Sequence, residues 1–170
     1  MPELPEVESV VRSLRPLVVG RRIISTDFPP ALPRELFRQR MRRIMGNPIE
    51  QFRRRLSGVL IRGIERHGKY IVFDLERDAQ RHRRDFLVVH LGMTGQLTCE
   101  DTPQFQSEHT HVVFSLSEPG RWLHYTDIRR FGRLRVTDRL LLNEGKLGPE
   151  PLEITQEEFA ARLRSRRTMM

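Results

Sequence analysis

Residues 59–76, VLIRGIERHGKYIVFDLE, mark the point at which apolar side chains change from helical spacing to a period of two. Alternation of this kind predicts half-buried strands, here over residues 59–66 and 69–76. The two segments flank His67 and Gly68, which suit a tight hairpin turn. The hairpin predicts that strands dominate the chain beyond it.

Further strands of the same kind follow. They are expected at residues 86–91, 96–100, 111–117, 122–125 and 133–136. Residues 118–120, Glu-Pro-Gly, should turn one hairpin, and the charged run 77–85 should form a solvated loop. So many short strands at close spacing favour a sandwich or a barrel. We therefore expect a mainly β protein with flanking helices (α+β), built as a two-layer β-sandwich.

Helices are expected before the hairpin. The first is indicated by apolar residues at helical spacing, namely Leu4, Val7, Val11, Leu14 and Val18. Pro16 should kink or end it. A strand at 22–28 precedes a basic helix at 34–45, whose core-facing stripe is Leu36, Phe37, Met41 and Ile44. Asn47 and Pro48 suit the N-cap and first position of a third helix that ends at Leu56.

The extreme N-terminus offers a nucleophile. Methionine aminopeptidases remove Met1 when the second residue is as small as proline, so the mature chain should begin with the secondary amine of Pro2. An α-amino group has a pKa of about 7.7–8.0, so part of it is unprotonated near neutral pH. Such an amine can attack an aldehyde carbon, and the resulting iminium has no N–H proton to lose. Its retained positive charge favours elimination at the next carbon.

Two carboxylates, those of Glu3 and Glu6, lie near the start of the first helix, where Pro5 fits the first turn. The helix would hold the amine and both acids on a buried scaffold. The alternative is that these carboxylates only complement the helix dipole, an effect of about 0.3–1 kcal/mol each.

Composition points to a polyanionic partner. The 170 residues carry a net charge of +8, and arginine greatly outnumbers lysine. Arginine favours phosphate because its planar fork donates two hydrogen bonds at once. At this length we expect one domain, or one domain with an appendage. Cys99 is the only cysteine, which excludes an internal disulfide and any multi-cysteine metal site within this chain.

Membrane and secretory classes are not favoured by the sequence. Apolar runs such as residues 86–89 and 140–142 are too short to span a bilayer. Glu3, Glu6 and Glu8 interrupt the apolar segment that a signal peptide needs. We therefore expect a cytosolic protein.

Two segments between strands carry candidate binding residues. Residues 91–95, Leu-Gly-Met-Thr-Gly, present Met93 beside glycines, and residues 126–132 carry Arg129, Arg130 and Phe131. Apolar and cationic side chains on such loops can wedge into a base stack and hold phosphates. Taken singly, each segment is explained more simply by core packing or by a charged edge.

Three other residues are candidates of lower specificity. His109 and His111 share a strand face as a metal pair would, but with no cysteine or third ligand nearby, contact with phosphate or a place on the sheet surface is favoured. Lys69, next to Gly68, is either a catalytic or phosphate-binding amine or an exposed lysine at the hairpin exit.

Taken together and in this order, the segments resemble the formamidopyrimidine-DNA glycosylase family, which includes the endonuclease VIII branch. The resemblance covers nearly the whole chain and is carried by PELPEVE (2–8), GKY (68–70), HLGMTG (90–95), YTDIRRFG (125–132) and LGPEPL (147–152). Leu4, where the endonuclease VIII branch tends to have glycine, points to the formamidopyrimidine branch. That branch removes oxidised purines such as 8-oxoguanine.

The resemblance implies base-excision repair by a bifunctional DNA glycosylase/AP lyase, acting as a monomer on damaged double-stranded DNA. It implies that Pro2 attacks C1′ of the damaged nucleotide, expels the base and leaves the iminium that drives strand cleavage. Glu3 would then act as acid toward the sugar and Glu6 would support that site. Lys69 matches the family's catalytic lysine.

Binding roles are implied in the same way. Met93, Arg129 and Phe131 match the residues that fill the gap when the damaged nucleotide is flipped out of the duplex. His109, Arg129 and one of the terminal arginines, Arg166, match DNA-contacting positions.

The resemblance also sets the expected domains. Residues 1–138 would form a catalytic β-sandwich domain with its N-terminal helix, and residues 139–170 a linker and the first helix of a helix-two-turn-helix domain. Thr155 and Glu158 form a capping-box pattern at the start of that helix. In the family the rest of that domain and a cysteine-ligated zinc finger normally follow. No cofactor is therefore expected in this chain, and its excision activity on duplex DNA should be weak.

Two other functions remain open from the residues. One is a non-catalytic DNA-binding fragment of the same fold. The other is an N-terminal-proline tautomerase that uses Pro2 as a base on a small keto acid, against which the net charge of +8 argues.

Overall fold

The computed structural model describes residues 2–29, 34–78, 83–105, 107–117, 120–138, 154–158 and 160–161. The chain divides into two compact units, Met1–Leu140 and Leu141–Met170. In the second unit, Thr155 and Glu158 form the expected reciprocal cap: the Thr155 N–H donates to Glu158 Oε2 at 3.1 Å and the Glu158 N–H to Thr155 Oγ1 at 3.2 Å. Its assignment to a helix-two-turn-helix domain stays a prediction.

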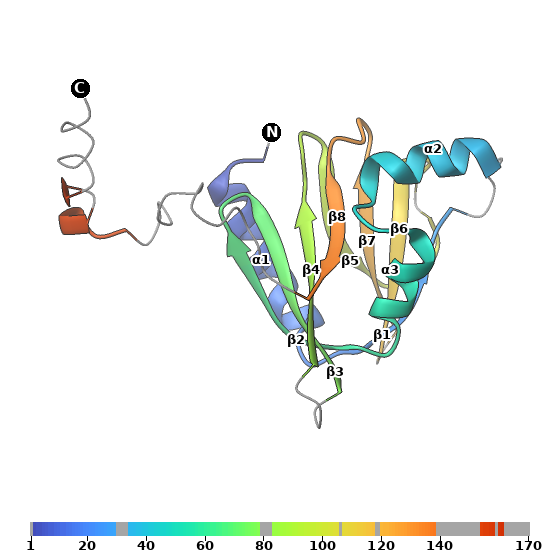
Figure 1. Ribbon diagram of the computed structural model, residues 1–170, viewed down its shortest axis with the longest axis horizontal. Coiled ribbons are helices and arrows are strands. Elements are labelled where there is room, and N and C mark those ends of the chain that lie inside the picture. Colours follow the sequence, from blue (N-terminus) through green and yellow to red (C-terminus); the bar gives the residue numbers. More distant parts are fainter. Residues whose placement is uncertain are drawn as a thin grey trace. The chain divides into compact units, whose positions relative to one another are not determined.

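The first unit is built on two four-stranded sheets (Figure 1). One sheet has the order β1 (Ile23–Asp27), β6 (Thr110–Leu116), β7 (Arg121–Asp127) and β5 (Gly95–Glu100). The other has the order β2 (Leu60–His67), β3 (Tyr70–Asp78), β4 (Arg83–His90) and β8 (Arg133–Thr137). All neighbouring strands are antiparallel. The expectation of a mainly β, two-layer sandwich is confirmed.

Helices close the two open sides of the sandwich (Figure 1). Helix α1 (Leu4–Val18) contacts β2 and β3 of one sheet and β5 of the other, whereas α3 (Ile49–Leu56) contacts β1 and β8. The predicted stripe of α1 is buried at Val7, Val11, Leu14 and Val18. Pro16 lies inside the last turn of α1 and does not end the helix.

Helix α2 (Arg34–Ile44) packs only part of the stripe expected of it. Met41 and Ile44 are buried and Phe37 is partly buried, but Leu36 is 54% exposed. The prediction was wrong for Leu36, which points to solvent, whereas Phe37, Met41 and Ile44 meet the core. None of the helices that the structure describes is long and apolar enough to cross a membrane.

The expected cap of α3 is also corrected. The Asn47 side chain makes no capping hydrogen bond. Its Nδ2 donates to the Val136 carbonyl at 3.0 Å, and its Oδ1 accepts from the Val136 N–H at 2.7 Å. Pro48 precedes the helix as its cap residue. Asn47 therefore bonds to Val136, 89 residues away, although the local sequence pattern predicted a bond to the start of α3.

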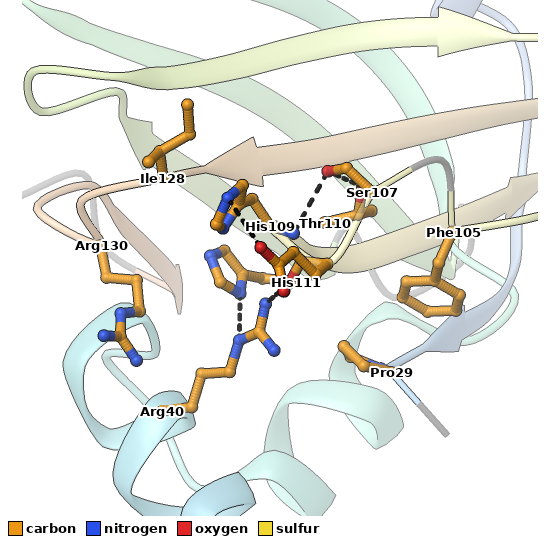
Figure 2. A pocket seen from close by; sticks show the side chains of 10 residues that line it. Pro29, Arg40, Phe105, Ser107, His109, Thr110, His111, Ile128 and Arg130 are labelled. Carbon is orange, nitrogen blue, oxygen red and sulfur yellow. Dashed lines mark hydrogen bonds and ion pairs between the residues drawn. The ribbon is translucent and has the colours of Figure 1, made fainter. Parts of the chain in front are cut away.

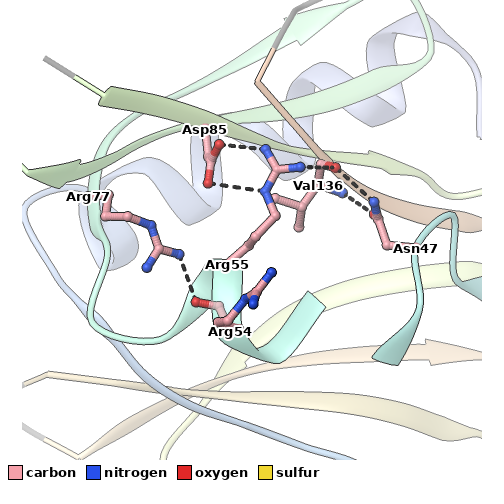
Figure 3. A network of polar contacts seen from close by, with 6 residues as sticks. All are labelled: Asn47, Arg54, Arg55, Arg77, Asp85 and Val136. Atoms are coloured by element: carbon pink, nitrogen blue, oxygen red, sulfur yellow. Dashed lines mark hydrogen bonds and ion pairs between the residues drawn. The ribbon is translucent and has the colours of Figure 1, made fainter. Parts of the chain in front are cut away.

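The run 77–85 was expected to be a solvated loop, which is wrong for its two ends, while residues 79–82 lie outside the described residues. Strands β3 and β4 extend to Asp78 and from Arg83, and Asp85 is 1% exposed. Arg55 of α3 forms a two-pronged ion pair with that carboxylate, with Nε 3.2 Å from Oδ2, and donates to the Val136 carbonyl (Figure 3). Removing one partner of such a buried pair typically costs about 3–5 kcal/mol.

Candidate active site and nucleic-acid interface

Strand register brings the important turns to one end of the sandwich. In one sheet a single row of cross-strand partners runs through His67, Tyr70, His90 and Arg133. In the other sheet, Gly95 pairs with Asp127. The β4–β5 and β7–β8 loops pass from one sheet to the other directly beyond these rows. Those loops and the β2–β3 turn therefore share the end at which α1 begins (Figure 1).

An ion-pair cluster fixes the first turns of α1 to this end. The Glu8 carboxylate accepts from Arg12 Nε at 2.9 Å and from Arg66 Nε, near the end of β2, at 3.0 Å. Arg66 also donates to the Gly68 carbonyl in the β2–β3 turn. Hydrogen bonds from Arg12 and then Arg66 lower the pKa of Glu8, so the carboxylate stays ionised. Pro2 and Glu3 are thereby held on the side of the sandwich that carries Lys69.

The helix start has the cap that its sequence allows. The Glu3 N–H donates to Glu6 Oε2 at 2.8 Å, and the two residues form a reciprocal capping box with Pro5 in the first turn. Pro2 is half-buried, whereas Glu3 and Glu6 are exposed. Both carboxylates are thus accessible to a ligand while they stabilise the helix, so capping and acid chemistry are compatible at these positions.

The β2–β3 turn is Gly68-Lys69, one residue later than expected, because His67 pairs with Tyr70. Gly68 has φ +57°, a left-handed conformation that favours glycine. Burial and then the charge of Lys69 lower the pKa of His90. The His90 ring also lies 5.0 Å from the Tyr70 ring centroid and accepts from the Gly92 N–H.

His90 was not singled out from the sequence. Its only signal was its place immediately before the glycine-flanked loop, which alone does not distinguish it from any strand-terminal histidine. The cross-strand register supplies what was missing, since it sets His90 opposite Tyr70 and beside the lysine turn.

One buried carboxylate joins the two candidate binding loops. Asp127 Oδ1 accepts from the Thr94 hydroxyl at 2.6 Å, and Oδ2 accepts from the Gly132 N–H at 2.8 Å and the Tyr125 hydroxyl at 3.2 Å. The Arg129 N–H donates to Oδ1 at 3.2 Å. Burial raises the pKa of Asp127, but the hydrogen bonds outweigh it and the pKa is lowered. Loop 91–95 and loop 128–132 are therefore fixed to each other.

Glycine allows this close approach. A Cβ on Gly92, whose φ is +66°, would lie 2.6 Å from the backbone nitrogen of Gly132. Real Cβ atoms do not approach backbone so closely, so the two loops can meet only without a side chain there.

The three candidate side chains on these loops are exposed to solvent. Met93 is 42% exposed and Phe131 is 52% exposed, so the core-packing alternative is wrong for both. The Arg129 guanidinium lies over the Phe131 ring, with Cζ 4.8 Å from the centroid. Exposed apolar groups next to a stacked arginine are suited to contact a base stack.

His109 and His111 are not a metal pair. His111 is buried, with Nε2 bonded to the Asp127 carbonyl at 2.7 Å and Nδ1 accepting from Arg40 Nε at 2.7 Å. Burial lowers the pKa of His111 to about 4. His109 is partly exposed and lies 3.4 Å from the carboxylate of Glu108. Over the described part of the chain, no group of three or more His, Cys, Asp or Glu side chains is placed to hold a metal.

The sequence of the first unit matches a known domain. The family model described as Formamidopyrimidine-DNA glycosylase N-terminal domain matches residues 1–134. The chain belongs to the formamidopyrimidine-DNA glycosylase family.

Curated glycosylases of this family are similar over nearly the whole chain. A formamidopyrimidine-DNA glycosylase of Solibacter usitatus is 39% identical, over 99% of this chain and 55% of the relative. One of Geobacillus kaustophilus is 37% identical, over 89% of this chain and 51% of the relative. The chain therefore spans about half the length of the curated glycosylases it matches.

Solved glycosylase structures agree with the fold. The Lactococcus lactis formamidopyrimidine-DNA glycosylase, bound non-covalently to DNA containing an AP site, superposes with a TM-score of 0.74 at 31% identity, over 95% of this chain and 55% of that one. MutM in complex with DNA containing carbocyclic 8-oxo-G gives a TM-score of 0.65 at 32% identity, over 80% of this chain and 44% of that one.

Within this glycosylase domain, the candidates gather unevenly. Lys69, Met93, Arg129 and Phe131 lie on the turns of one end of the sandwich, and His109 lies at the start of β6 beside the β7–β8 loop. Arg166 is outside the described residues. Asp127 and His90 are additions that the structure makes to the set.

Exchanging Met93 or Phe131 for alanine should weaken binding to damaged duplex DNA by about tenfold to a hundredfold, because a buried apolar contact contributes about 1.5–3 kcal/mol. Binding to single strands should change less, since a wedge matters only where a stack must be opened. Fluorescence anisotropy with matched duplex and single-stranded oligonucleotides measures both.

Ile24→Ala is the matched control, because Ile24 is equally exposed at 53% but lies on β1, next to the pair of Ile23 with Leu116 at the far end of β6. It should leave both affinities unchanged. Urea unfolding tests whether Met93 and Phe131 instead serve core packing. A fall of about 3–5 kcal/mol in the free energy of unfolding of either loop variant is the cost of an emptied core site and would contradict the wedge role.

Proposed function

We propose that the chain carries the catalytic chemistry of a bifunctional DNA glycosylase and AP lyase that removes oxidised purines. The observation that supports it most is the shared location of the helix start and the two joined loops. The ion pair between Glu8 and Arg66 connects the start of α1 to the β2–β3 turn that carries Lys69. Asp127 joins loop 91–95 to loop 128–132 at the same end of the sandwich. A glycosylase needs this proximity, because the residues that open the base stack must lie close to the nucleophile that attacks the flipped-out nucleotide.

The proposed reaction starts at the amine that removal of Met1 would create on Pro2. The nitrogen lone pair forms a bond to C1′ of the damaged nucleotide, and the bond from C1′ to the base breaks. The base leaves with the bonding electron pair and takes up a proton, and the Pro2 nitrogen loses its own proton. Glu3 protonates the sugar oxygen, which opens the ring and gives the iminium. Loss of a proton from C2′ then expels the 3′ phosphate and cleaves the strand.

Supporting roles follow from position. Glu6 holds the Glu3 backbone through the capping box, so the acid keeps a defined place relative to Pro2. Lys69 provides a positive charge at the neighbouring turn, suited to a phosphate or to a developing negative charge. We assign His109, Arg129 and a terminal arginine, Arg166, to DNA contact.

The proposed partner is damaged double-stranded DNA, bound by a monomer in the bacterial cytosol. The solved relatives in complex with damaged DNA support this assignment. No cofactor takes part in the proposed steps. Because an existing abasic site has no base to expel, we expect strand cleavage there to be stronger than excision of 8-oxoguanine from duplex DNA.

Salt dependence tests the choice of partner. With roughly four to six phosphate contacts, a plot of log K against log salt should have a slope of about −4 to −5 for duplex DNA containing an abasic analogue. Affinity measured from low to moderate salt gives the slope directly. A slope near zero, together with turnover of a small keto acid, would favour an N-terminal-proline tautomerase instead.

A DNA-binding fragment without catalysis would show the same slope. It is distinguished by strand cleavage at abasic sites, which a binding fragment lacks and the proposed lyase performs.

A further inference from the structure

Positive charge is concentrated beside the candidate site, on helices that carry none of the family segments. Residues 34–56, which include α2 and α3, hold eight arginines and two glutamates, a balance of +6 within a chain whose net charge is +8. Helix α2 lies at the same end of the sandwich as the β7–β8 loop (Figure 1). The charge that attracts a polyanion therefore extends beyond the residues discussed above.

A hollow of about 470 Å³ lies where α2 meets that loop. Its lining includes Arg40 from α2, Arg130 and Ile128 from the loop, and His109 near the start of β6 (Figure 2). Two guanidinium groups thus face one open space from two different elements.

Arg40 is held in place by the protein. Its Nε donates to His111 Nδ1 at 2.7 Å, and Nη2 donates to the Glu108 carbonyl. His111 in turn is bonded to the Asp127 carbonyl. Within the described residues Nη1 has no partner, so it keeps free N–H groups in a fixed orientation. Such pre-organisation reduces the entropy lost when a ligand binds.

Arg130 reaches the hollow by an unusual backbone. Its φ is +57°, and it is the one non-glycine residue with positive φ in the described chain. This conformation is unfavourable for an arginine, and residues held in such regions are concentrated at functional sites. Its side chain makes no hydrogen bond to any described residue.

The two charges are not balanced. Burial and then Arg130 lower the pKa of Arg40, and Glu108 only partly offsets this. In the described chain no carboxylate comes within ion-pair distance of either guanidinium, and the Glu108 carboxylate lies instead beside His109. An anion between the two arginines would relieve their repulsion.

We propose that Arg40 and Arg130 bind a phosphodiester of the DNA backbone in this hollow, next to Arg129 and Phe131. The inference rests on the proposed function, since it takes DNA as the ligand. Arginine forks suit phosphate oxygens, and contacts of this kind position the duplex without reading its sequence. The proposed DNA-binding surface therefore extends from loop 128–132 to Arg40 on α2.

Arg130→Gly and Arg40→Gln test the site, and Arg54→Gln on α3 is the control for loss of one exposed charge. Arg130→Gly suits this backbone because glycine adopts positive φ freely, so it should not unfold the loop. Arg40→Gln keeps a donor for His111. Thermal unfolding of each variant checks that the fold persists.

The readout is the salt dependence of binding to duplex DNA, with and without an abasic analogue. Each site variant should reduce the slope of log K against log salt by about 1 and weaken both duplexes equally. Arg54→Gln should leave the slope nearly unchanged. Wild-type slopes in both site variants, or an equal fall in the control, would overturn the phosphate site. Borohydride trapping of the wild-type chain, run in parallel, decides the proposed function independently.

Discussion

Asp127→Ala should destabilise the fold by about 3–4 kcal/mol, because it leaves several buried donors without an acceptor at about 1–3 kcal/mol each. The carboxylate accepts from the Thr94 hydroxyl, the Tyr125 hydroxyl and the Gly132 N–H, and is itself fully buried. Urea unfolding measures the loss. The same change should abolish discrimination between damaged duplex and single strands, since both wedge loops lose their common anchor.

Tyr125→Phe is the matched partial variant. It removes one of the donors and keeps the ring, so the expected cost is about 1 kcal/mol. If Asp127→Ala costs no more than Tyr125→Phe, the carboxylate does not join the loops and the account of the wedge is wrong.

Asp127 also predicts how stability depends on pH. Its pKa is lowered in the folded protein relative to an unfolded value of about 3.9, so the folded state binds the proton less tightly. Its contribution is therefore complete well above pH 4 and is lost as the pH falls through 4 toward the folded pKa. Asp127→Asn should lack this part of the acid destabilisation, and the difference between the two unfolding curves measures it.

Two variants of Pro2 should separate the position of the amine from its chemistry. Leucine at position 2 is too large for methionine removal, so Pro2→Leu keeps Met1 and moves the amine by about 3.3–3.6 Å. A displacement of 1 Å can already cost about a hundredfold, so strand cleavage at abasic sites should fall by at least that factor.

Pro2→Ala allows methionine removal and leaves a primary amine at the original position. Its Schiff base has an N–H proton to lose, so the positive charge is not retained and elimination should be slower than in the wild type but faster than in Pro2→Leu. Single-turnover cleavage gives the rates, and the intact mass shows the N-terminus of each variant. Equal rates for Pro2→Leu and the wild type would exclude the N-terminal amine.

Local patterns predicted the elements well where neighbours in sequence decide them. The helical spacing of Val7, Val11 and Leu14 and the period of two beyond Val59 describe burial against a single core. The strand order could not be predicted, because it depends on pairs such as Phe86 with Thr137 that lie far apart in the chain.

Misses arose where a distant partner overrode a local preference. Asp85 was predicted to lie in a loop because its neighbours are charged, but it is buried and forms an ion pair with Arg55. Asp127 was noted only as part of segment 125–132. Aspartate at the start of a turn commonly binds the backbone N–H two residues on, and this preference could have singled it out. Arg40 had no signal, since its partner His111 is 71 residues away.

The central claim is that Pro2 is the nucleophile, and borohydride trapping on duplex DNA with an abasic site tests it most directly. Reduction fixes a Schiff base as a stable amine, so only a covalent enzyme remains attached to the oligonucleotide. Peptide mapping of the adduct should place the DNA on the N-terminal peptide, at the Pro2 nitrogen. An adduct on Lys69, or no adduct under conditions where the chain binds the same DNA, would contradict the account.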